Sequence, residues 1–127
     1  LGFWYPELNE GYLADTPPNI PPNIFFSEGL CIASALGNVA ERGRNFKVAI
    51  YTDNEASFQV FSSFHSIPSY NPILIYAADV MMKNNLQVRV VWTAGKKNRV
   101  ADVLSRHDRD RAVSYAPNLE ISPFTPP

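Results

Sequence analysis

The order of the expected secondary structure predicts an α/β fold. Apolar residues recur at helical spacing over residues 27–42 and 71–83. Short apolar or alternating runs at residues 46–52 and 86–92 are typical of strands. Because these strands and helices follow one another along the chain, at least two of the strands are expected to be parallel.

The composition is that of one globular domain. The chain has 127 residues, of which 46% are hydrophobic and 18% charged, so it can bury a real core. Its net charge of −1 argues against a protein that coats nucleic acid non-specifically, although it leaves room for a local basic patch. No apolar run reaches the roughly 18 residues that cross a bilayer, so no membrane partner is expected.

The single cysteine, Cys31, bears on the compartment. It cannot form a disulfide within the chain, which suits a reducing, intracellular location in the cytoplasm or nucleus. It lies in an apolar stretch, so we expect a packed thiol and not a reactive one.

The first half of the chain is expected to hold two strands and one helix before residue 46. Residues 1–5, "LGFWY", have aromatic strand character. The prolines and asparagines of residues 6–23 predict an irregular loop that has room for a short edge strand, and residues 24–26 suggest a brief strand. Ser27 is placed to cap a helix that runs to about Arg42, where a glycine follows.

The second half alternates strands and helices up to Arg106. The run at residues 46–52 predicts a strand buried inside a parallel sheet, and a helix is expected over residues 53–64. A further helix, a strand and a short final helix capped by Asn98 should follow. We therefore expect one domain over residues 1–106 and a loose, charged and then proline-rich tail over residues 107–127.

Three carboxylates occupy positions that suggest a metal site. Glu28 lies in the expected first turn of a helix, Asp53 at the carboxyl end of a strand, and Asp102 in the segment "NRVADVLSR". Sites in open α/β sheets form outside the carboxyl ends of the strands. Carboxylates gathered there can bind Mg²⁺, with Mn²⁺ as an alternative, and two such ions can promote phosphodiester cleavage.

Each of these acids also has a structural interpretation. Glu28 and Asp53 lie at expected helix starts, where the helix dipole favours a negative charge, and on position alone capping is the better-supported role of both. Asp102 can be a solvated helix residue whose neighbours Val100 and Leu104 bury the other face.

A basic cluster surrounds the turn before the last expected helix. Its cations are Lys96, Lys97, Arg99 and Arg106. They could contact phosphates, or they could simply belong to a solvated turn. Trp92, at the end of the preceding strand, could stack on a base, but a core position is the simpler expectation.

Three motifs resemble, in order, the ribonuclease H domain of retrotransposon polyproteins. They are "FFSEGLCIASAL", "AIYTDNEASFQVF" and "AGKKNRVADVLSR". The last is similar to the signature P-G-x-x-N-x-x-A-D-x-L-S-R that closes the domain, with Ala94 in place of the proline. The segments "GFWYPELNEGY" and "SYNPILIYAADVMMKNN" look especially like copies in fungal retroelements, and the resemblance covers residues 1 to about 106.

The resemblance implies a five-stranded mixed sheet flanked by helices and Mg²⁺-dependent hydrolysis of RNA in RNA–DNA hybrids. Of the family's four catalytic acids, Glu28 matches the second, Asp53 the third and Asp102 the fourth. The first acid lies on a strand before the stretch that matches "LGFWY" and has no counterpart here. The implied domain therefore lacks its central first strand, and we expect weak activity or none. The implied partners are the hybrid and the reverse transcriptase domain of the same polyprotein.

Two other interpretations stay open. One is a non-catalytic relic or connection-like domain, which keeps the fold and binds nucleic acid or supports a polymerase. The other is an unrelated α/β module in which the three acids only cap or solvate helices. The second of these leaves the ordered match of three motifs unexplained.

Overall fold

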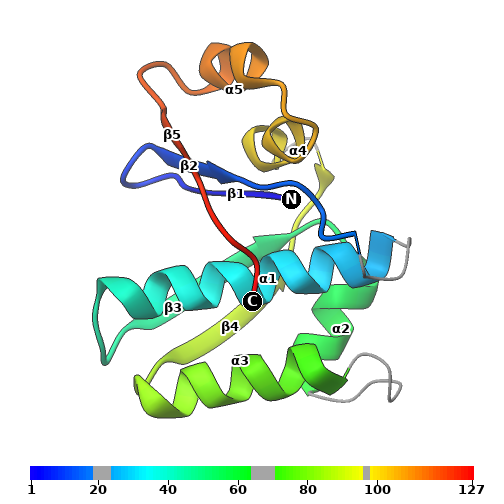
Figure 1. Ribbon diagram of the computed structural model, residues 1–127, viewed down its shortest axis with the longest axis vertical. Helices are drawn as coiled ribbons and strands as arrows, with labels where there is room; N and C mark the ends of the chain where they lie inside the picture. Colours follow the sequence, from blue (N-terminus) through cyan, green and yellow to red (C-terminus); the bar gives the residue numbers. More distant parts are fainter. Residues whose placement is uncertain (19–23, 64–70, 96–97) are drawn as a thin grey trace.

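A computed structural model describes residues 1–18, 24–63, 71–95 and 98–127 of the chain. Strands and helices alternate through most of it, which confirms the predicted α/β class (Figure 1). The strands are β1 (Gly2–Tyr5), β2 (Glu10–Leu13), β3 (Lys47–Thr52), β4 (Gln87–Trp92) and β5 (Glu120–Pro123). The helices are α1 (Ile24–Arg42), α2 (Glu55–Ser63), α3 (Asn71–Lys83), α4 (Arg99–Ser105) and α5 (Arg109–Tyr115).

The strands form two separate sheets. In the first, β2 lies in the middle, antiparallel to β1 and parallel to β5. In the second, β3 and β4 pair in parallel, with Lys47 opposite Gln87 and Thr52 opposite Trp92. Within the described residues β1 bonds only to β2, and β3 only to β4, so each keeps one unpaired edge.

The larger hydrophobic core lies between α1, α2, α3 and one face of the β3–β4 sheet. Leu36 of α1 and Ala77 of α3 are fully buried in it. The helical stripe predicted for α3 is confirmed, because Ile73 and Ala77 are buried while Val80 and Met81 pack against the same cluster. Leu1 and the β1 side chain of Phe3 also reach this core, which joins the first sheet to the second.

A second core lies on the other side of the β1–β2 hairpin, under α4 and α5 (Figure 1). Leu104 of α4 and Ala112 of α5 are fully buried there. Glycines bring α4 very close to the hairpin: a Cβ at Gly2 would lie 2.5 Å from the backbone nitrogen of Ser105. The hairpin is thus packed between α1 on one side and α4 on the other.

A polar cluster ties the hairpin to the end of α1. The Arg42 guanidinium donates to Glu10 and to the Tyr12 hydroxyl, both at 2.6 Å, and its central carbon lies 4.4 Å from the centre of the Tyr5 ring. Burial raises the pKa of Tyr5 to about 12, so its hydroxyl stays protonated and donates to Asn38 at 2.7 Å.

Helix α1 begins earlier than predicted. Residues 24–26, expected to be a brief strand, form its first turn, and Ser27 lies inside the helix instead of capping it. The prolines up to residue 22 misled the prediction, because a helix can start directly after such a segment. The predicted end is confirmed: the helix stops at Arg42, and Gly43 follows with a φ of 150°, in a region that favours glycine.

Three other expectations were wrong. The strand at residues 47–52 is not buried on both faces, because Lys47, Ala49 and Tyr51 are exposed. Residues 107–127 are not a loose tail: they form α5 and β5, and β5 bonds in parallel to β2. Strand β2 itself lies at the centre of its sheet and not at an edge. The division of the chain at residue 106 stays a prediction.

Candidate functional site

Asp53 follows β3 directly and does not cap α2. The cap is its neighbour Asn54, whose side-chain oxygen accepts from the backbone N–H of Ser57 at 2.8 Å. The Asp53 carboxylate instead lies against the turn after β4, since a Cβ built on Gly95 would be 3.3 Å from its Oδ2. Parallel pairing of β3 and β4 brings both carboxyl ends to this edge. The capping interpretation of Asp53 is therefore wrong.

Glu28 is the fifth residue of α1, and no acidic residue lies in the first turn of that helix. The capping interpretation therefore fails for this residue as well. The pKa of Glu28 is raised from its ordinary value, first by burial and next by the negative charge of Asp53. The positive charge of the chain's amino group lowers this pKa, and Asp102 raises it further. Glu28 therefore lies within electrostatic reach of both other predicted acids.

Asp102 lies on α4, whose apolar side faces the hairpin. Val100 and Leu104 are buried, as the sequence predicted. The side chain of Asp102 is 43% exposed, and its Oδ2 lies 3.5 Å from a guanidinium nitrogen of Arg106. At this exposure the ion pair contributes little to stability. Asp102 is thus at once a solvated helix residue and a charge that acts on Glu28.

Asp53 and Asp102 act electrostatically on Glu28, but the three acids do not form a finished metal site. Across the described residues, no three side chains of His, Cys, Asp or Glu stand in an arrangement that could hold an ion. The donor set nevertheless fits Mg²⁺, which prefers oxygen ligands and keeps several waters. Burial, followed by repulsion from Asp53 and Asp102, raises the pKa of Glu28, and a bound cation would relieve the repulsive part.

The predicted basic cluster is only partly described by the structure. Lys96 and Lys97 lie outside the described residues. Arg99 places its guanidinium carbon 5.6 Å from the centre of the Tyr115 ring, and Arg106 pairs with Asp102. Arg99 and Arg106 therefore already have partners within the chain. Their contact with phosphates stays a prediction.

Sequence reasoning missed an exposed basic and aromatic surface on β3 and β4. Tyr51 belongs to this surface and is 61% exposed. Trp92, expected in the core, is also 51% exposed, but it is paired with Thr52 and so lies on the opposite face of the sheet. Lys47 and Arg89 are exposed on the same two strands. Side-chain exposure alternates strictly along β3, but the sequence does not reveal this alternation because Ala49 and Tyr51 are apolar residue types that are exposed here. The charge in the middle of "LQVRVVW" was the signal that one face of β4 meets solvent.

The cysteine behaves as predicted. Cys31 is buried, its thiol donates to the carbonyl oxygen of Gly2 at 3.2 Å, and burial raises its pKa to about 12. It is therefore a packing residue that joins α1 to β1.

No family model, curated protein or solved structure matches the chain. In the portion of the chain with described structure, no helix combines the length and apolar character that a membrane span requires.

Proposed function

We propose that this chain is a ribonuclease H-like domain of a retroelement polyprotein, in which Glu28, Asp53 and Asp102 bind Mg²⁺ for hydrolysis of RNA in RNA–DNA hybrids. The observation that carries the proposal is the position of Asp53, which follows β3 at the shared carboxyl edge of two parallel strands and lies against Gly95 of the turn after β4. Burial raises the pKa of Glu28, and the charges of Asp53 and then Asp102 raise it further, which supports a site shared by the three motifs. The hybrid and the polymerase domain of the same polyprotein are the proposed partners, inside the cell in the cytoplasm or nucleus.

The chain's own residues supply positioning and charge. Parallel strands β3 and β4 hold Asp53 beside Gly95, while α1 holds Glu28 in a half-buried position. When bound, Mg²⁺ supplies an activated water and stabilises the leaving oxygen. Arg106 competes for Asp102, so Asp102 must exchange this partner for the cation. The family's first catalytic acid has no counterpart among these three, so we expect slow cleavage by this chain alone.

Magnesium titration tests the proposal directly. Calorimetry on the wild type, Glu28→Gln and Asp53→Asn should show that each substitution weakens Mg²⁺ binding at least about 10-fold, as loss of a metal ligand does. Glu7→Gln is the matched control, because Glu7 is an exposed acid in the turn between β1 and β2. Equal Mg²⁺ affinity in all four proteins, or no binding in any, would sink the proposal.

A cleavage assay tests the chemistry. The chain is incubated with a labelled RNA–DNA hybrid and Mg²⁺ or Mn²⁺, and we expect slow cleavage that Asp53→Asn abolishes. Rapid cleavage that Asp53→Asn abolishes would contradict the expected weakness but support the role of Asp53. Cleavage that survives this substitution would refute that role.

A second candidate is a non-catalytic domain of the same fold, which binds nucleic acid or supports the polymerase. The ion pair between Asp102 and Arg106 favours it, because a paired carboxylate is less available to a cation. This candidate predicts hybrid affinity that is unchanged by chelation of divalent ions and by substitution of the three acids. Affinity should instead fall when Lys96 and Lys97 are replaced by glutamine.

A further inference from the structure

The β3–β4 sheet has one face that none of the described helices covers. This outer face consists of alternate residues of the two strands, namely Lys47, Ala49 and Tyr51 of β3 and Gln87, Arg89 and Val91 of β4. The intervening residues face the core, where Val90 is buried and Ile50 and Val88 pack against α1, α2 and α3. The outer face is therefore a surface and not part of the core.

The outer face carries positive charge that the chain does not neutralise. Arg42, Lys83 and Arg106 each have a carboxylate within 2.6 to 3.5 Å. Lys47 and Arg89 have no such partner among the described residues, and the undescribed residues 19–23, 64–70 and 96–97 contain no aspartate or glutamate. Both cations are thus available to a negatively charged ligand.

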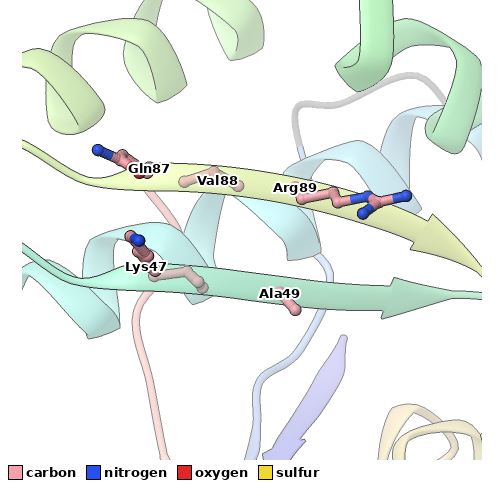
Figure 2. Close-up of a pocket in the computed structure, with 6 residues that line it drawn as sticks. Lys47, Ala49, Gln87, Val88 and Arg89 are labelled. Carbon is pink, nitrogen blue, oxygen red and sulfur yellow. The ribbon is translucent and has the colours of Figure 1, made fainter.

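The cations border a shallow hollow of about 340 Å³. Figure 2 shows Lys47 and Gln87 beside each other at one end of it, while the Arg89 side chain extends along β4 toward the carboxyl end of the strand. Ala49 lies opposite Arg89, and its small side chain leaves the hollow open. Arg89 also borders a second groove of about 620 Å³ between α2 and β4, which Trp92 lines.

An exposed aromatic ring completes the surface. Tyr51 follows Ala49 on the same side of β3 and is 61% exposed. Since a strand rises about 3.3 Å per residue, Tyr51 lies roughly 13 Å along β3 from Lys47. Cations that meet phosphates and an aromatic ring that stacks on a base are the combination that binds single-stranded nucleic acid without sequence preference.

We propose that the outer face binds a single strand of nucleic acid, with phosphates at Lys47 and Arg89 and a base stacked on Tyr51. An acidic polypeptide would use the two cations but would gain less from the ring. The hollow is lined by Lys47, Gln87 and Arg89 together with Val48, Ala49 and Val88, and the two cations favour a negatively charged partner. Binding here needs neither a metal ion nor the three acids, so it stands or falls separately from the proposed nuclease activity.

Fluorescence anisotropy with a labelled ten-nucleotide single strand, in EDTA, tests this surface. With two phosphate contacts, a plot of the logarithm of affinity against the logarithm of salt concentration should have a slope of about −1.4. The double variant Lys47→Gln/Arg89→Gln should abolish this salt dependence. Tyr51→Ser should weaken binding roughly 5- to 150-fold, whereas Tyr51→Phe should preserve it. Lys83→Gln, which removes an exposed but paired cation of α3, is the matched control and should bind as the wild type does.

Each other outcome overturns the inference. Unchanged binding by the Lys47 and Arg89 double variant would remove the charge argument, and equal affinities for Tyr51→Ser and Tyr51→Phe would remove stacking. Competition by polyglutamate as effective as competition by unlabelled oligonucleotide would assign the face to an acidic polypeptide instead. All substituted side chains are exposed, and circular dichroism should show unchanged folding in every variant.

Discussion

Replacement of Gly2 by alanine should strongly destabilise the chain, because it separates the hairpin from α4. The added Cβ would lie 2.5 Å from the backbone nitrogen of Ser105 and 2.8 Å from the carbonyl carbon of Leu104. Ordinary contacts of a Cβ begin near 3.4 Å, so α4 would have to retreat by almost 1 Å. Backbone atoms of a helix cannot rotate away as a side-chain end can. We therefore expect a loss near the upper end of the range of about 1–3 kcal/mol for overpacked cores.

Gly11→Ala is the matched control on the neighbouring strand. Its Cβ would meet Leu104 at 2.9 Å and Leu119 at 3.4 Å, but in both cases the contact is a terminal methyl group of a leucine. These side chains can shift, and alanine also limits the unfolded chain more than glycine does. Gly11→Ala should therefore cost no more than about 1 kcal/mol.

Urea unfolding followed by circular dichroism and tryptophan fluorescence measures both variants. Trp4 lies on β1 and packs against the core beneath α4, so its emission reports on the displaced contact. A loss of less than about 0.5 kcal/mol for Gly2→Ala, or a loss smaller than that of Gly11→Ala, would refute the packing argument.

Two further predictions concern charge. Glu28 loses its proton at lower pH in the unfolded chain than in the folded one, because folding raises its pKa above 4.5. The stability that Glu28 contributes is therefore lost as pH rises through the raised pKa. At pH 7 the Glu28→Gln variant should unfold at a higher urea concentration than the wild type. At pH 3, where Glu28 is protonated, the two proteins should unfold at the same urea concentration. Arg42→Met should destabilise the hairpin, because the contact of Arg42 with the Tyr5 ring alone is worth about 0.5–1 kcal/mol. Arg44→Met is the control and should lower the melting temperature less than Arg42→Met does, with both measured by thermal unfolding.

Each of these two predictions has a result that would contradict it. A stability difference between wild type and Glu28→Gln that is the same at pH 3 and pH 7 would show that proton release from Glu28 is not its cause. For the hairpin, equal melting temperatures of the Arg42→Met and Arg44→Met variants would mean that the cluster around Arg42 contributes no net stability.

Elements with a strong local signal were predictable from the sequence. The stripe of α3, the strand β4 and the glycine that follows α1 all follow from short-range periodicity or backbone preference. The start of α1 was not predictable in this way, because Ser27 is a good cap in isolation and only tertiary packing extends the helix to Ile24. Local propensity is a weak guide where such packing decides.

The end of the chain was missed for a different reason. Its charges and prolines resemble those of a linker, but Leu119 is buried and β5 bonds to β2, which lies more than a hundred residues earlier. Composition carries no information on a pairing between such distant segments. The prolines are tolerated because β5 is an edge strand.

Part of the candidate site was also accessible from sequence. The position of Asp53 at a strand end was predicted, and the structure removes its competing role as a cap because Asn54 performs it. The approach of Asp102 to Glu28 depends on how α4 packs on the hairpin, which no local pattern reveals. Likewise, the pairing of Asp102 with Arg106 follows from their helical spacing, but its competition with a cation does not.

The parallel bond between β2 and β5 has a consequence for the order in which the protein assembles. Glu10 is registered with Glu120, so the hairpin emerges from the ribosome about 110 residues before its third strand does. Pairings this distant in sequence slow folding, and β2 stays open to other chains until β5 has been synthesised. Expression at lower temperature, or with a chaperone that shields the nascent hairpin, should therefore raise the yield of the monomeric protein.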